Sequence, residues 1–214
     1  MRKQAHKIIS SFSADLRSSV IVHGSLARGD VDDQSDIDTL VQHDLSTQII
    51  ENRLEAAGYR VYEREIAQAT PMHTPKAHIY LDPEHKTAVT IPLLPLRRLE
   101  YEFYRFGGSI GPKEIDSETR VIGCTKRLTL IQPTQTGHSE SSIIGKEALT
   151  AKFLGVSLGI VQERVRVLSR RDKIGRTGVF LRVPVEEDLS FEEALSHEAR
   201  ENPALRRTLR QRDR

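Results

Sequence analysis

A glycine–serine turn and a pair of aspartates stand close together near the start of the chain. Residues 23–29 read HGSLARG, and residues 35–38 read SDID. Gly24 allows a ligand to approach the backbone closely, the Ser25 hydroxyl can donate a hydrogen bond, and Arg28 would add a fixed positive charge. Because a turn of this kind opens a helix, it suits a phosphate group.

The two aspartates predict a metal site. Asp36 and Asp38 are two residues apart at the entry to the apolar segment 37–41. On a strand, residues with this spacing project from the same face. Two carboxylates held side by side repel each other unless a cation joins them, and oxygen ligands suit Mg²⁺. Three other acids of the intervening segment are expected to be solvated loop charges: Asp30, Asp32 and Asp33.

Strands and helices alternate around these residues. Helical spacing of apolar residues predicts helices over residues 3–16, 47–57 and 96–106. Runs of β-branched or alternating residues predict strands over residues 20–23, 37–41, 60–66, 77–81 and 87–94. The sequence therefore predicts an α/β (α+β) domain with a mixed sheet over residues 1–106.

The C-terminal part is predicted as a second, mainly helical domain. Residues 107–145 are interpreted as a connecting region, with a strand within 121–132. Two helices follow over 146–154 and 158–170, and Ala151, Gly155 and Val161 have the spacing of a helix-turn-helix. A hairpin over 174–183 would form its wing, and helices over 191–200 and 203–212 end the chain. Residues 146–214 therefore read as a winged helix-turn-helix-like domain.

Basic residues gather in this second part. Residues 1–125 carry 15 Lys/Arg against 18 Asp/Glu, whereas residues 126–182 carry 11 against 4. Ile160, Val161, Val165 and Leu168 are expected to face inward, which leaves a basic outer face: Arg164, Arg166, Arg170 and Arg171, with Arg176 at the hairpin tip. Phosphate contacts from this set would bind DNA or RNA, and docking of a protein partner is the alternative.

The composition indicates a soluble globular protein. The single cysteine, Cys124, excludes an internal disulfide and is expected to be a small core residue. No apolar run approaches the roughly 18 residues of a membrane span, and no secretory signal is evident, so a cytoplasmic location without a membrane partner is expected. His23 is interpreted as a strand-end residue, and His138 either approaches a ligand or is exposed in a polar loop.

Residues 24–38 resemble the DNA polymerase β-type nucleotidyltransferase superfamily. The pattern of that superfamily, Gly-Ser followed by Arg-Gly and then Ser-Asp-x-Asp, stands here at residues 24–25, 28–29 and 35–38. The closest types are minimal nucleotidyltransferases and archaeal CCA-adding enzymes. The resemblance implies an NTP substrate held by Gly24, Ser25 and Arg28. It also implies Mg²⁺ (or Mn²⁺) bound by Asp36 and Asp38, which act in the transfer of an NMP to an acceptor hydroxyl.

The sequence departs from the family pattern at a third carboxylate, which the family carries on a later strand. Residues 87–95 contain no acid, and Thr90 or Pro92 occupies the expected place. Asp82 and Glu65 are the two candidate replacements. Two hypotheses follow: a Mg²⁺-dependent nucleotidyltransferase, or a catalytically degenerate, nucleotide-sensing transcriptional regulator that binds DNA through the winged helix. The sequence is compatible with a homodimer.

Overall fold

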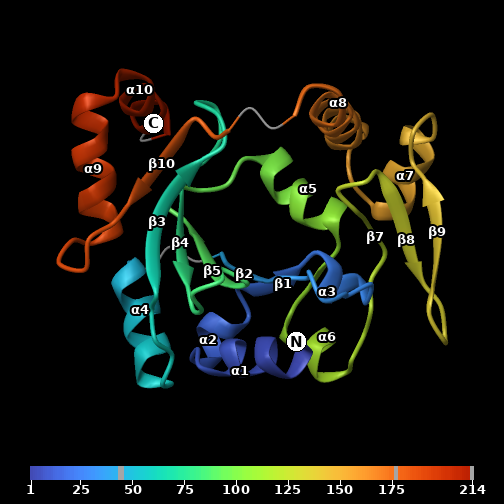
Figure 1. Cartoon of the computed structure of the whole chain (residues 1–214), viewed down its shortest axis with the longest axis horizontal. Coiled ribbons are helices and arrows are strands. Elements are labelled where there is room, and N and C mark those ends of the chain that lie inside the picture. The colour runs from blue at the N-terminus through green and yellow to red at the C-terminus, as the bar shows by residue number, and fades with distance from the viewer. Residues whose placement is uncertain (43–45, 176–177, 213–214) are drawn as a thin grey trace.

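The computed structural model describes residues 1–42, 46–175 and 178–212. Residue 212 is described by its backbone alone. The described chain folds around one mixed sheet with the strand order β10-β3-β4-β5-β2-β1-β6 (Figure 1). Its strands are β1 (Val20–His23), β2 (Ile37–Val41), β3 (Glu63–Gln68), β4 (Lys76–Tyr80), β5 (Thr87–Pro92), β6 (Ser109–Ile110) and β10 (Leu181–Pro184). The mixed α/β fold expected from the sequence is confirmed.

The pairing of the central strands fixes which residues are neighbours. β2 runs parallel to β5, while the other pairs of this sheet are antiparallel. Asp38 of β2 lies opposite His23 of β1 and opposite Ala88 of β5. Because paired residues point to the same face, these three side chains share one side of the sheet.

The other side of the sheet is apolar and holds the main core. Val22, Val41 and Val89 alternate with the residues of the first face and are fully buried. Helices cover this side, and they come from both ends of the chain (Figure 1). They are α1 (Arg2–Ser10), α2 (Ala14–Arg17), α4 (Thr47–Ala56), α9 (Phe191–Glu201) and α10 (Pro203–Arg212).

The face that carries Asp38 is covered in part by α5 (Arg98–Gly107). Leu40, Leu96 and Tyr104 form a small buried cluster between this helix and the sheet. Beyond the cluster the face is polar, with Lys76, His78 and Tyr80 of β4. We call this side the inner face of the sheet.

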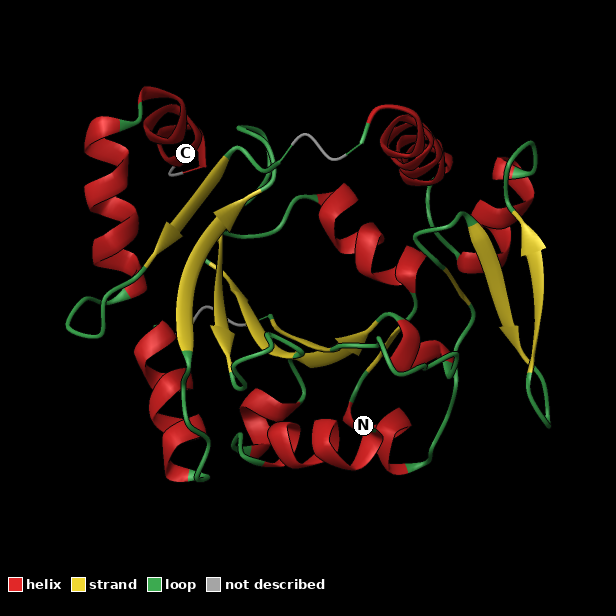
Figure 2. Ribbon diagram, viewed as in Figure 1, coloured by secondary structure: helices red, strands yellow, loops and turns green. Residues whose placement is uncertain are grey.

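A smaller module packs beside the main sheet (Figure 2). It contains a three-stranded antiparallel sheet, β7 (Gly123–Cys124), β8 (Thr129–Pro133) and β9 (His138–Ser142), with helices α7 (Glu147–Leu154) and α8 (Leu158–Ile174). Cys124, Leu154 and Val161 belong to its own core, which Phe106 of α5 joins to the main body. The remaining short helices are α3 (Ser25–Arg28) and α6 (Pro112–Asp116).

The helix pair α7–α8 forms as the sequence predicts. Gly155 ends α7 in the left-handed conformation (φ 61°), and the Ser157 side chain accepts a hydrogen bond from the Ile160 amide at the start of α8. Ile160, Val161 and Leu168 are buried, as expected. Within the part of the chain described, no helix is both long and apolar enough to cross a membrane.

The hairpin expected as a wing over 174–183 is described except at residues 176 and 177. The described part of 174–183 contains one strand, β10, which pairs antiparallel with β3 at the edge of the main sheet. Leu181, Phe191 and Leu205 are buried in the main core rather than in a second domain. The last part of residues 146–214 thus packs with the main sheet in the described chain, whereas the sequence predicts it in a second domain. Arg176 lies outside the described residues.

Candidate active site

The glycine–serine turn connects β1 to α3. Gly24 has φ 81° and ψ −146°, a combination that is essentially restricted to glycine. Its amide donates to the Gly108 carbonyl (2.9 Å), which fixes the turn against the end of α5. Helix α3 is a single turn that begins at Ser25, and the first amides of a helix have no partner within it. The turn thus offers backbone amides and a hydroxyl at one place.

The two aspartates lie beside this turn. The Ser25 hydroxyl donates to the Ser35 hydroxyl (3.1 Å), so the turn lies against the residue that precedes Asp36. Asp38 is partly buried on the inner face, opposite His23. Desolvation raises the pKa of Asp36, and the neighbouring Asp38 carboxylate raises it further. The two acids are therefore close enough to repel each other, which a bound cation would relieve.

The donor set fits a magnesium ion. Mg²⁺ in nucleotide enzymes is commonly held by one or two carboxylates, with waters and phosphate oxygens as its other ligands. Asp36 and Asp38 supply the two carboxylates. Within the described ranges, no group of three or more His, Cys, Asp and Glu side chains is arranged to hold a metal.

Neither candidate for a third acid joins this pair. Glu65 lies on β3, three strand spacings from β2, or about 14 Å. Its carboxylate is buried and accepts a hydrogen bond from the Arg182 guanidinium of β10. Asp82 lies nearer to Asp36, but its Oδ1 accepts the Lys86 amide (2.9 Å) and closes the turn between β4 and β5.

Neutral groups occupy the place of the third acid on β5. Ala88 and Thr90 face the same side as Asp38. The Thr90 hydroxyl is 3.0 Å from Nδ1 of His78, which lies opposite it on β4. Burial, followed by the charge of Lys76, lowers the pKa of His78 to about 4. The imidazole is therefore uncharged at neutral pH.

Arg28, expected to contact phosphate, is buried and hydrogen-bonded to other parts of the protein. Its side chain is 6% exposed and donates to the carbonyls of Gly107 (2.6 Å) and Cys124 (3.4 Å). It also forms an ion pair with Asp30 (2.9 Å). The guanidinium is thus held between α3, the end of α5 and β7, and Asp30 is a partner rather than a solvated loop charge.

His23 lies beside the site, as a strand-end residue should. Its ring packs edge-on against Tyr104 of α5, with 4.9 Å between the ring centroids. Burial lowers the pKa of His23, and the Asp38 carboxylate opposes this effect. The ring therefore forms part of the wall between the aspartates and α5.

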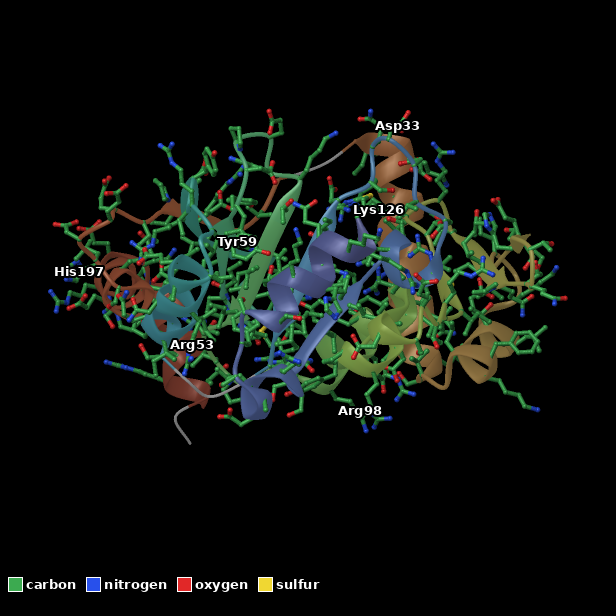
Figure 3. The ribbon with its side chains drawn as sticks, turned by 90° about the horizontal axis from the view of Figure 1, so that it is seen from below. Asp33, Arg53, Tyr59, Arg98, Lys126 and His197 are labelled. Carbon is green, nitrogen blue, oxygen red and sulfur yellow. The ribbon has the colours of Figure 1, made fainter. Side chains whose placement is uncertain are left out.

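Lys126 is a cation of the site that the sequence did not identify. It is exposed in the turn between β7 and β8, and its charge lowers the pKa of both Asp36 and His23. Figure 3 shows Lys126 below the loop that carries Asp33. No sequence signal marks it, because the packing of the small module against α3 brings it there.

The basic residues of α8 separate into two groups. Arg166, Arg170 and Arg171 are exposed. Arg164 is partly buried, with its guanidinium carbon 5.1 Å from the centre of the Phe103 ring, so it serves packing between α8 and α5. Desolvation correspondingly lowers the pKa of Arg164.

Two other residues singled out in the sequence lie away from the aspartates. His138 is on the exposed strand β9, and its Nε2 is 3.1 Å from the Glu140 carboxylate, so it does not join the site. Cys124 is buried in the small module, and burial raises the pKa of its thiol to about 12. It is the inert core residue that the sequence predicts.

A cavity of about 540 Å³ lies at the other end of β2 and β5. Its walls include Gln42, Thr47 and Glu192, with the apolar residues 93–96. It contains neither Asp36 nor Asp38. The cavity is therefore separate from the two aspartates.

Residues 2–90 match the family model described as the nucleotidyltransferase domain. This stretch contains the glycine–serine turn, both aspartates and most of β5. The match supports the superfamily expected from the sequence, and it ends before α5 and the small module. No curated protein and no solved structure matches the chain.

Proposed function

From the nucleotidyltransferase match over residues 2–90, we propose that the protein is a Mg²⁺-dependent (or Mn²⁺-dependent) nucleotidyltransferase. It would move an NMP from an NTP to an acceptor hydroxyl, with release of pyrophosphate. The observation that carries this proposal is the placement of Asp36 and Asp38 beside the Gly24–Ser25 turn, joined to it by the hydrogen bond between Ser25 and Ser35.

Each part of the site has a role in this reaction. The Ser25 hydroxyl and the amides of the turn would hold the triphosphate, and Gly24 keeps the backbone open to it. Asp36 and Asp38 would hold the metal, which when bound neutralises charge on the phosphates. Positioning and charge neutralisation supply most of the catalysis in reactions of this class.

Activation of the acceptor hydroxyl is the weak point of the site. The hydrogen-bonded pair of Thr90 and His78 occupies the place of the third carboxylate. A neutral pair removes a proton less readily than a carboxylate that faces a metal. We therefore expect turnover to be slow.

The exposed basic residues of α8 support a nucleic-acid contact. Arg166, Arg170 and Arg171 are free of the packing that holds Arg164. Lys and Arg side chains on one helix bind phosphate backbones without reading the sequence. We propose that an RNA or DNA strand that approaches the site makes contact here.

Labelled NTPs test the proposed reaction. The protein would be incubated with each of the four NTPs, Mg²⁺ and RNA or protein acceptors, and transfer of label would be followed. Asp38→Asn should lower the rate about 100-fold or more, because one metal carboxylate is removed. EDTA should abolish transfer.

Asp33→Asn is the matched control. Asp33 is exposed on the loop that precedes β2, and its substitution removes the same charge, so this variant should keep the wild-type rate (Figure 3). Absence of transfer with every NTP, or an undiminished rate in Asp38→Asn, would contradict the proposed function.

A further inference from the structure

We propose that Lys126 binds the phosphate groups of the NTP, and that Arg28 positions the turn that carries Lys126. The proposal rests on the proposed function, since it concerns the same site. It transfers the cationic role expected of Arg28 to a residue of the small module.

The first step of the argument is the anchoring of β7. The Arg28 guanidinium donates to the Cys124 carbonyl of β7 and to the Gly107 carbonyl at the end of α5. Its ion pair with Asp30 holds the other side of the group. Because Arg28 is buried, these contacts fix β7 against the helix that follows the glycine–serine turn.

Two glycines allow β7 to lie close to the end of α5, in the corner that these elements form with α3. A β-carbon at Gly123 of β7 would lie 2.6 Å from the Gly108 amide nitrogen and 2.7 Å from the Gly107 carbonyl oxygen. A β-carbon at Gly108 would lie 2.8 Å from Cγ of Arg28, and Gly108 has φ 82°. The backbones of β7 and the end of α5 thus approach as closely as only glycine permits.

The turn after β7 is held by its own hydrogen bonds. The Thr125 hydroxyl accepts the amides of Arg127 (3.1 Å) and Thr129 (3.4 Å). The Leu128 amide donates to the Thr125 carbonyl (3.1 Å), and Leu128 has φ 59° and is buried. A non-glycine residue in this conformation persists only where its surroundings determine it. The direction in which Lys126 leaves the backbone is therefore well defined.

Lys126 follows Cys124 by two residues, and the Cys124 carbonyl accepts a hydrogen bond from Arg28 of the helix that begins at Ser25. The positive charge of Lys126 lowers the pKa of His23, which precedes Gly24, and of Asp36, which follows the Ser35 that accepts from Ser25. Within the described residues Lys126 forms no ion pair. Lys86 also lowers the pKa of Asp36, but its ammonium already donates to the Asp33 carbonyl (3.3 Å). A compact ammonium beside a metal carboxylate pair suits a phosphate oxygen.

Binding of Mg²⁺–tripolyphosphate tests the proposal without knowledge of the base. Dissociation constants would be measured by calorimetry at fixed ionic strength. Lys126→Ala should weaken binding about tenfold, whereas Lys126→Arg should stay close to wild type because the positive charge remains. Arg127→Ala is the matched control, since it removes a charge from the same exposed turn, and it should leave binding unchanged.

The outcomes separate this proposal from the proposed function. If the wild type binds Mg²⁺–tripolyphosphate and Lys126→Ala binds it equally well, the role of Lys126 is overturned. The proposed nucleotidyltransferase function is not affected by that result. An equal loss in Arg127→Ala would also overturn it, because the effect would then come from general surface charge. No binding of Mg²⁺–tripolyphosphate by the wild type would overturn both.

A double-mutant cycle tests the positioning role of Arg28. Arg28→Gln should weaken tripolyphosphate binding when it is the only substitution. In the Lys126→Ala background it should cause little further loss of binding, because both changes remove the same contact. Additive losses would overturn this role. Arg28→Lys, which keeps the charge but loses the fork that spans two carbonyls, should show the same pattern if Arg28→Gln does not fold.

Discussion

Around Asp38 the inner face presents the rings of His23, His78 and Tyr104. Burial lowers the pKa of both His23 and His78, and it raises the pKa of Tyr104. These rings therefore carry no charge at neutral pH. The Asp38 carboxylate raises the pKa of Asp36, and the charges of Lys126 and Lys86 lower it. A metal–triphosphate, as proposed above, would add a cation beside the two carboxylates.

His78 makes the stability of the fold sensitive to acid. Its pKa falls from 6.5 in the unfolded chain to about 4 in the folded protein, so the unfolded chain binds the proton first as the pH falls. The contribution of His78 is thus complete above pH 6.5 and is lost between pH 6.5 and 4. It amounts to about 3 kcal/mol. Urea unfolding at a series of pH values would measure it.

Two glutamine variants isolate this contribution. His78→Gln should flatten the loss of unfolding free energy between pH 6.5 and 4. His197→Gln, at an exposed position on α9, should leave the wild-type profile unchanged (Figure 3). Identical pH profiles for wild type and His78→Gln would show that burial of the imidazole does not control acid stability.

At the scale of elements, the corner between α3, α5 and β7 links the two sheets. Arg28 and two glycines hold it, and the turn with Lys126 follows directly. The small module therefore contributes to the site through the placement of its first turn. Its helix pair, which the sequence makes conspicuous, packs in the core of the small module, where α8 contacts α5.

Gly123 is the element-scale test of this corner. Gly123→Ala would place a methyl group against backbone atoms of Gly107 and Gly108, and such overpacking costs about 1–3 kcal/mol. The same variant should weaken Mg²⁺–tripolyphosphate binding, because β7 must move. Chemical denaturation and calorimetry would measure the two effects.

Gly137→Ala is the control for this variant. Gly137 lies in the hairpin between β8 and β9, a β-carbon there meets nothing within 4 Å, and its φ is outside the left-handed region. The free energy of unfolding should change by less than about 0.5 kcal/mol. Equal effects at Gly123 and Gly137 would show that the corner tolerates a side chain and does not fix Lys126.

At the scale of the whole molecule, the two ends of the chain share one core. Phe191 of α9 is fully buried, and the Arg64 guanidinium of β3 lies 4.7 Å from its ring centre. Arg64 also pairs with Glu51 of α4 (2.6 Å). The segment from β10 to α10 therefore packs in the core of the sheet that carries the aspartates.

Phe191→Ala tests this shared core. Removal of a buried phenylalanine costs about 3–5 kcal/mol, and the cost should appear in unfolding of the entire main sheet. Phe153→Ala makes the same chemical change on α7, where the side chain is 51% exposed, and should cost far less. Denaturation followed by circular dichroism and by tripolyphosphate binding would compare them. Retention of the wild-type midpoint by Phe191→Ala would contradict a shared core.

The sequence alone determined the local elements and the acid pair. The sequence predicts several elements close to their observed bounds. They are the strand at residues 37–41, the two helices of the small module, and the two C-terminal helices α9 and α10. The periodicity of apolar residues and the residues that cap helices depend on a few sequence neighbours. Local structure can therefore be predicted from them. For the same reason, Gly24, Ser25, Asp36 and Asp38 could be assigned to one site from their spacing.

Only the tertiary structure decided which distant segments complete that site. It paired β10 with β3, turned Arg28 toward the Cys124 carbonyl, and placed Lys126 near Asp36. It also formed β9 in a stretch whose polar composition predicts a loop, because pairing with β8 supplies the hydrogen bonds that the residues alone do not favour. Contacts between residues far apart in sequence depend on the packing of whole elements, which no local pattern specifies. The pair of Asp36 and Asp38 could therefore be predicted from the sequence, whereas the position of Lys126 depends on the tertiary fold.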